Sequence, residues 1–91
     1  MNMTCKYLTK SELRKANRRA AKGAGLYIDP EYVEALPDNR RYPILFAMPW
    51  ERHGWVRCQV TTPNGEEYLP LWLDVPRSIY DKLREVTVPG D

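Results

Sequence analysis

The sequence has one histidine, two cysteines and no long apolar run. Cys5 and Cys58 match no metal or redox spacing, and a closed zinc site needs four ligands, which these residues and His53 supply poorly. No apolar stretch approaches the ~18 residues of a membrane span, and the N-terminal residues lack the apolar part of a signal peptide. We therefore expect a cytoplasmic protein with free thiols, no metal, no cofactor and no membrane contact.

Catalytic motifs are missing as well. The sequence has no glycine-rich phosphate loop, no nucleophile elbow and no pair of carboxylates at a spacing that indicates an acid–base pair. Cys58 and His53 would be a conceivable nucleophile and base. However, Cys58 occupies one of the apolar positions of a predicted strand in which apolar and polar residues alternate, and a free cysteine there usually fills the core. The sequence predicts a protein that is not an enzyme.

The length of 91 residues allows one small domain, 1–91. An apolar content of 43% indicates a folded chain, and the large apolar residues are concentrated after residue 25. We expect a basic helical segment (1–25), an α+β body (26–86) and a tail (87–91).

Charge is distributed unevenly. Residues 1–23 carry a net charge of +6, and since the whole chain carries +2, the rest carries −4. Thr9 and Glu12 have the spacing of a capping box, which predicts a basic helix over 10–22 that ends at Gly23. Its apolar stripe is narrow and mostly alanine. Such a helix packs weakly on its own core but can lie close to another surface, and its opposite side is basic. Six cations are expected there: Lys10, Arg14, Lys15, Arg18, Arg19 and Lys22.

Two further helices are predicted. Asp29 as N-cap and Pro30 at the first position favour a short helix near 30–36. The segment 74–76 opens a C-terminal helix that we expect to reach about Glu85.

Between these helices the pattern predicts three strands. The apolar run 42–48 favours a strand that is buried on both faces, and 55–62 and 66–74 follow as strands around a turn. The fold class is therefore α+β, with a three-stranded antiparallel sheet over about 42–74. Pro70 has no N–H to donate, so 66–74 is expected at an edge or kinked.

The turn at 63–65 leaves two pairings open. A two-residue turn at Asn64-Gly65 places Cys58 opposite Leu71, whereas a type I turn with a bulge at Gly65 places it opposite Pro70. Pro63 fits the second position of the bulged turn, so we favour that pairing.

The candidate binding residues fall into three groups. The six cations of helix 10–22 are suited to phosphates or to an acidic protein surface. Asn17 beside them could read a base edge, although a solvated polar position is the more common meaning of such a residue. Arg40 and Arg41 add a smaller basic point. The loop 50–54 offers Trp50, Arg52 and His53, residue types that stack bases or form hot spots of protein interfaces.

Two functions fit this inventory. The first is a small binding protein that docks on a partner and modulates or inhibits it. Small phage and plasmid accessory proteins that act on host nucleic-acid or defence machinery, such as CRISPR complexes, often have this form. The partner would be an acidic protein surface, a nucleoprotein complex or a second copy of the chain. The second function is a regulator that binds nucleic acid directly through helix 10–22, against which the net charge of only +2 counts.

Overall fold

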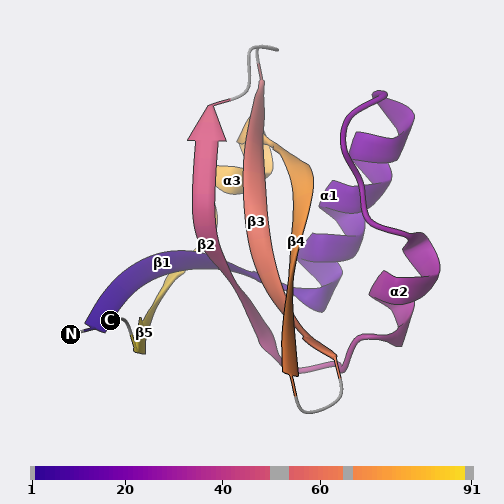
Figure 1. Ribbon diagram of the computed structural model, residues 1–91. Helices are drawn as coiled ribbons and strands as arrows, with labels where there is room; N and C mark the ends of the chain where they lie inside the picture. Colours follow the sequence, from indigo (N-terminus) through magenta and orange to yellow (C-terminus); the bar gives the residue numbers. More distant parts are fainter. Residues whose placement is uncertain (1, 50–53, 65–66, 90–91) are drawn as a thin grey trace.

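A computed structural model describes residues 2–49, 54–64 and 67–89. This part of the chain forms five strands and three helices, which are mixed along the sequence (Figure 1). In chain order the elements are β1 Asn2–Thr9, α1 Lys10–Lys22, α2 Pro30–Ala35, β2 Arg41–Pro49, β3 Trp55–Asn64, β4 Glu67–Pro76, α3 Arg77–Tyr80 and β5 Glu85–Pro89.

The sheet has five antiparallel strands in the order β4-β3-β2-β1-β5. The α+β class is therefore right, but the predicted three-stranded sheet is wrong. β1 lies within the segment predicted to be basic and helical, and β5 takes in part of the predicted tail. These strands escaped prediction because each depends on a distant partner for its hydrogen bonds, with Cys5 opposite Val86.

The predicted C-terminal helix is wrong in extent. α3 ends after one turn, where the Asp81 N–H donates to the Arg77 carbonyl at 2.9 Å. Leu83 then enters the core from an irregular segment. The chain continues as β5, whose valine and threonine residues favour a strand.

The first two helices are confirmed where the capping signals placed them. The Thr9 hydroxyl accepts from the Glu12 N–H at 3.2 Å, and the Glu12 carboxylate accepts from the Thr9 N–H at 3.0 Å. The Asp29 side chain accepts from the Glu31 N–H at 3.0 Å, with Pro30 at the start of α2. Local side-chain chemistry therefore fixes both helix starts.

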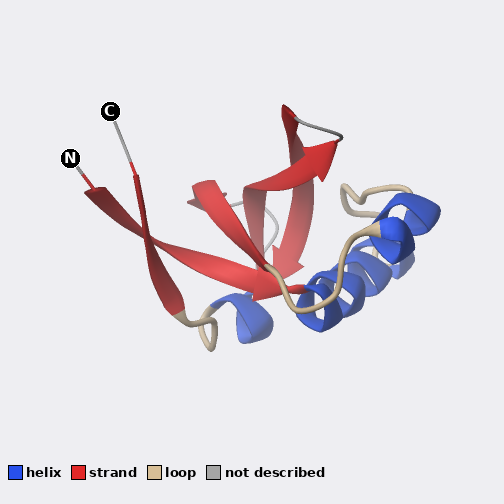
Figure 2. Cartoon of the chain, turned by 90° about the horizontal axis from the view of Figure 1, so that it is seen from below, coloured by secondary structure: helices blue, strands red, loops and turns tan. Residues whose placement is uncertain are grey.

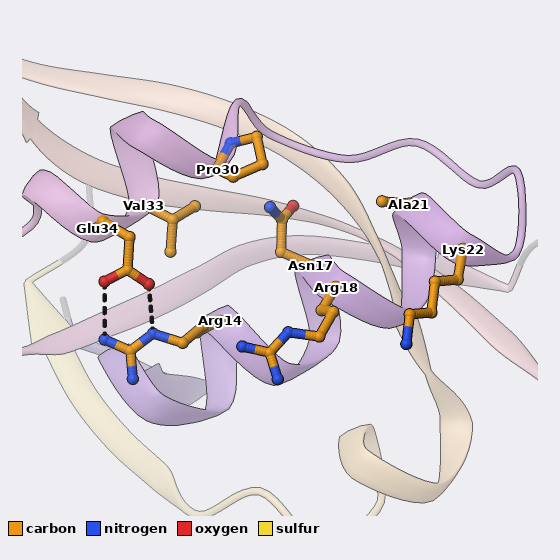
Figure 3. A pocket seen from close by; sticks show the side chains of 8 residues that line it. All are labelled: Arg14, Asn17, Arg18, Ala21, Lys22, Pro30, Val33 and Glu34. Carbon is orange, nitrogen blue, oxygen red and sulfur yellow. Dashed lines mark hydrogen bonds and ion pairs between the residues drawn. The ribbon is translucent and has the colours of Figure 1, made fainter.

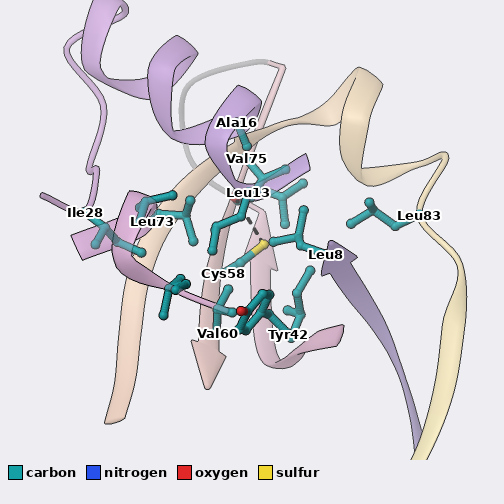
Figure 4. Packing of buried hydrophobic residues seen from close by; sticks show 14 residues of the cluster. Leu8, Leu13, Ala16, Ile28, Tyr42, Cys58, Val60, Leu73, Val75 and Leu83 are labelled. Atoms are coloured by element: carbon teal, nitrogen blue, oxygen red, sulfur yellow. Dashed lines mark hydrogen bonds between the residues drawn. The ribbon is translucent and has the colours of Figure 1, made fainter. Parts of the chain in front are cut away.

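The core lies between the helices and one face of the sheet (Figure 4). Leu13 and Ala16 of α1 and Val33 of α2 are buried against side chains that alternate along the strands. The strand residues in this cluster are Leu8, Tyr42, Ile44, Val56, Cys58, Val60, Leu73 and Val75. Figure 2 shows α1 and α2 together on one side of the sheet.

The other side of the sheet, which we call the outer face, is not covered by these helices. The prediction that 42–48 is buried on both faces is wrong, since residues 45–48 are exposed. A register shift between Ile44 and Phe46 interrupts the alternation of buried and exposed residues along β2. The sequence of β2 therefore does not show the alternating pattern by which a strand with one exposed face is usually predicted.

Both predicted hairpin registers are wrong. Cys58 lies opposite Leu73, and the ladder extends to Asn64 opposite Glu67. This pairing puts Cys58 and Leu73 on the core face, with a valine on either side of Cys58 in the alternation. It also brings Arg57 opposite Asp74, where they form an ion pair of 2.8 Å. The prediction that the Pro70 strand lies at an edge is confirmed, because β4 ends the sheet.

Candidate binding surfaces

The first surface is the exposed side of α1, which we call the basic face. Lys15, Arg18, Arg19 and Lys22 are exposed there, and none forms an ion pair within the described part of the chain. These side chains lie opposite the buried stripe, as helical periodicity requires. Four of the six predicted cations therefore remain available to a ligand.

The other two cations attach α2 to α1. The Arg14 guanidinium donates to both oxygens of Glu34, at 2.6 and 3.1 Å (Figure 3). This pairing lowers the pKa of the Glu34 carboxyl below its usual range. Lys10 donates to the Glu34 carbonyl at 2.7 Å and lies 3.6 Å from the Asp38 carboxylate. Their charges are thus largely matched within the protein.

A groove separates α1 from α2 and encloses a cavity of about 350 Å³. Val33, Pro30 and Ala21 give it apolar walls, and Arg18 and Lys22 lie along its α1 side (Figure 3). The groove therefore lies next to the basic face and adds a small apolar recess to it.

The Asn17 side chain binds the protein's own backbone. Its side chain is 3% exposed and points from α1 toward the segment that leads to α2 (Figure 3). The amide nitrogen donates to the Ile28 carbonyl at 2.7 Å, and the amide oxygen accepts from the Ile28 N–H at 2.7 Å. The base-reading role considered from the sequence is therefore wrong, because both amide atoms are used to hold the chain.

The second surface is the outer face, where large apolar side chains are exposed. Phe46 is 60% exposed and Tyr68 is 68% exposed, and Leu45 and Met48 are also exposed. Trp72 of β4 lies beside Phe46, with the ring centroids 6.3 Å apart. The exposed residues of β2 and β4 therefore form a continuous apolar area across the sheet.

The outer face is also hollowed. β1 pairs with β2 only over Tyr7–Thr9, and its N-terminal half diverges with β5 from the other strands (Figures 1 and 2). A cavity of about 430 Å³ opens there, which we call the trough. Its lining combines β2, β3, β4 and β5 and consists of Arg40, Arg41, Tyr42, Pro43, Leu45, Thr61, Pro63, Tyr68, Val88 and Pro89.

Arg40 and Arg41, which the sequence had singled out, both line this trough. The Arg41 guanidinium lies 5.1 Å from the centroid of the Tyr7 ring, and the Arg84 guanidinium lies 5.5 Å from the same centroid. The Tyr7 side chain is buried, and its ring helps to hold both cations in place by cation–π contact. The positive charge of Arg41 is thus held next to the apolar lining of the trough.

The remaining predicted site residues, Trp50, Arg52 and His53, lie outside the described residues. Trp55 and Trp72 are both partly buried, and Trp55 lies so close to α1 that a methyl group on Gly23 would be 3.0 Å from its ring. The sequence missed Leu45, Phe46 and Met48 as surface residues. A signal for them was present in the sequence. The predicted helices have few apolar faces, enough to cover only one side of a sheet, so some apolar strand residues had to be exposed.

The Cys58 thiol lies in the core of the protein. Burial raises the pKa of the Cys58 thiol to about 12, so this thiol is protonated at neutral pH. Within the described ranges no group of histidine, cysteine and acidic side chains is placed to hold a metal ion. No helix in those ranges is long and apolar enough to cross a membrane.

These two surfaces have to be interpreted from the chain's own residues. No family model, no curated protein and no solved structure matches it.

Proposed function

We propose that this chain is a non-catalytic binding protein that docks on a protein partner through the outer face of its sheet and modulates that partner. The observation that carries the proposal is the exposure of Leu45, Phe46, Met48 and Tyr68 on one uncovered face. Contiguous apolar areas of this kind are uncommon on monomers and mark interaction sites. Inhibition of a partner in host nucleic-acid or defence machinery, as in phage- or plasmid-type accessory proteins, remains part of this proposal.

The composition of the face favours a protein over a nucleic acid. Aromatic side chains and arginine serve both kinds of interface. Leu45, Met48 and Val88 are aliphatic, however, and aliphatic groups gain free energy chiefly by burial against other apolar groups. A protein surface supplies such groups, whereas stacked bases and phosphates supply few.

The test is a capture experiment with matched variants. We expect proteins retained by the wild-type chain to be lost with the double variant Phe46→Ser Met48→Ser. Measured by calorimetry with the purified partner, the affinity should fall at least tenfold, the effect of losing one hot spot of about 1.4 kcal/mol or more.

The control for this experiment is the double variant Arg18→Gln Lys22→Gln on the basic face, which should retain the same proteins. Thermal unfolding of both variants checks that the fold is intact. The opposite pattern, with loss only in the basic-face variant, would assign docking to α1 and reject the outer face.

A second candidate function, direct nucleic-acid binding, rests on the four exposed cations of the basic face, which have no ion-pair partner among the described residues. We expect Arg18→Gln Lys22→Gln to weaken binding to duplex DNA equally for all sequences. If each side chain neutralises one phosphate, the slope of log affinity against log salt should fall by about 1.8. Fluorescence anisotropy at several salt concentrations measures this slope.

The charge-matched control is Arg77→Gln Arg84→Gln, which removes two cations that already have acidic neighbours, Asp81 and Glu12. This control should leave most of the slope in place. Equal slopes in the wild type and both variants would remove the basic face from nucleic-acid binding.

A further inference from the structure

We infer that the trough of the outer face receives an acidic segment of a protein partner, whose apolar side chains enter the cavity while its carboxylates meet Arg40 and Arg41. This inference rests on the proposed function and specifies the chemistry of the partner.

The outer face carries charge of one sign. The alternation along β2, β3 and β4 places Arg41, Arg57 and Asp74 on this face. Asp74 is 1% exposed and accepts two hydrogen bonds from Arg57, so it presents no free negative charge. Among the residues that the structure describes, the charge that this face offers to a partner is therefore positive.

The trough itself combines positive charge with apolar surface. Its described lining contains two arginines and no carboxylate, next to the apolar side chains of Leu45, Tyr68 and Val88. A cavity of about 430 Å³ is large enough for one or two bulky side chains. Apolar groups flanked by acidic groups complement both parts of this lining.

Arg41 is oriented in a way that suits a carboxylate ligand. Its guanidinium lies 5.1 Å from the centroid of the buried Tyr7 ring, so the planar group is oriented before a ligand arrives. Arg84 lies on the same ring and forms a long ion pair of 3.9 Å with Glu12. An oriented guanidinium loses less conformational entropy when it binds a carboxylate with two hydrogen bonds.

Both edge strands of the sheet carry a proline, Pro70 in β4 and Pro89 in β5. Proline has no N–H, so each edge lacks a donor that an added strand would need at that position. The partner is therefore expected to use side chains on the face of the sheet.

A selection from a displayed library of random linear peptides tests the inference. Peptides enriched on the wild-type chain should combine large apolar residues with aspartate and glutamate and carry net negative charge. The double variant Arg40→Glu Arg41→Glu should instead enrich neutral or basic peptides. For one synthesised acidic peptide, Arg40→Gln Arg41→Gln should weaken binding at least about tenfold.

Two controls keep this result interpretable. The variant Arg18→Gln Lys22→Gln removes the same charge from the basic face and should bind the acidic peptide like the wild type. Arg40 and Arg41 are both exposed, so their variants should fold, which thermal unfolding verifies. Arg41→Lys keeps the charge without the planar guanidinium and should have an intermediate affinity.

Each other outcome rejects the inference. Enriched peptides that depend on Leu45 and Phe46 but show no acidic bias would overturn the partner's chemistry and leave the proposed function standing. Absence of any peptide that depends on the outer face would reject both proposals. Single-stranded RNA binding lost in Phe46→Ser, or wild-type self-association in sedimentation lost in the same variant, would assign the face to nucleic acid or to a second copy.

Discussion

Replacement of Asp74 by alanine is expected to lower the free energy of unfolding by about 3 kcal/mol. The carboxylate is 1% exposed and accepts from the Arg57 Nε at 2.8 Å and the Arg57 Nη2 at 3.1 Å. It also accepts from the Leu26 N–H at 2.8 Å. Alanine would leave a partly buried guanidinium and a backbone N–H without this acceptor, and both losses oppose folding.

Asp74 has this effect because it joins the helical layer to the sheet. Its own N–H donates to the Leu26 carbonyl at 2.8 Å, so the chain after α1 is fixed to the edge of β4. Gly25 approaches so closely that a methyl group there would lie 2.9 Å from the Asp74 carboxylate. Loss of the carboxylate therefore loosens the segment that leads from α1 to α2.

Urea unfolding followed by tryptophan fluorescence measures the change. The control is Asp81→Ala, which removes an exposed carboxylate 3.7 Å from Arg77 and should cost less than about 0.5 kcal/mol. Equal losses in the two variants would show that burial and the contact with Leu26 add nothing to the ion pair.

The helices near the N-terminus could be predicted because their determinants are local. Thr9 and Glu12 lie three residues apart and satisfy each other's backbone, so the capping box needs no tertiary structure. Asp29 and Pro30 define the start of α2 in the same way. A pattern of a few consecutive residues was sufficient in both cases.

The added strands could not be predicted because their determinants are distant. β5 pairs with β1, so residues from opposite ends of the chain, such as Met3 and Val88, supply each other's hydrogen bonds. The turn signal at 63–65 also misled, because the observed pairing brings Arg57 opposite Asp74, and this ion pair joins residues 17 positions apart. Tertiary contacts outweighed local turn preference.

The candidate site was only partly accessible for the same reason. The composition and helical periodicity of residues 10–22 were enough to predict the basic face. They could not show that Arg14 pairs with Glu34, because that ion pair depends on how α2 packs on α1. The outer face was missed because β2 looks like a buried strand in sequence. Phe46 is exposed only because the helices of the described chain lie on the other side of the sheet.

Replacement of Asn17 by alanine is expected to cost about 2–3 kcal/mol of unfolding free energy. Its amide makes two hydrogen bonds of 2.7 Å to the backbone of Ile28, whose side chain belongs to the core. Alanine would leave a buried N–H and a buried carbonyl without partners. Urea unfolding measures the loss, and hydrogen exchange should show faster exchange of the Ile28 amide.

Ser11→Ala on the same helix is the control, since Ser11 is exposed and its loss should change stability by less than about 0.5 kcal/mol. This comparison separates a structural role for Asn17 from a ligand-binding role. If the alanine variant kept wild-type stability but lost affinity for duplex DNA, Asn17 would belong to a nucleic-acid interface. Loss of stability with unchanged affinity of the folded fraction instead makes Asn17 the residue that positions the groove between α1 and α2.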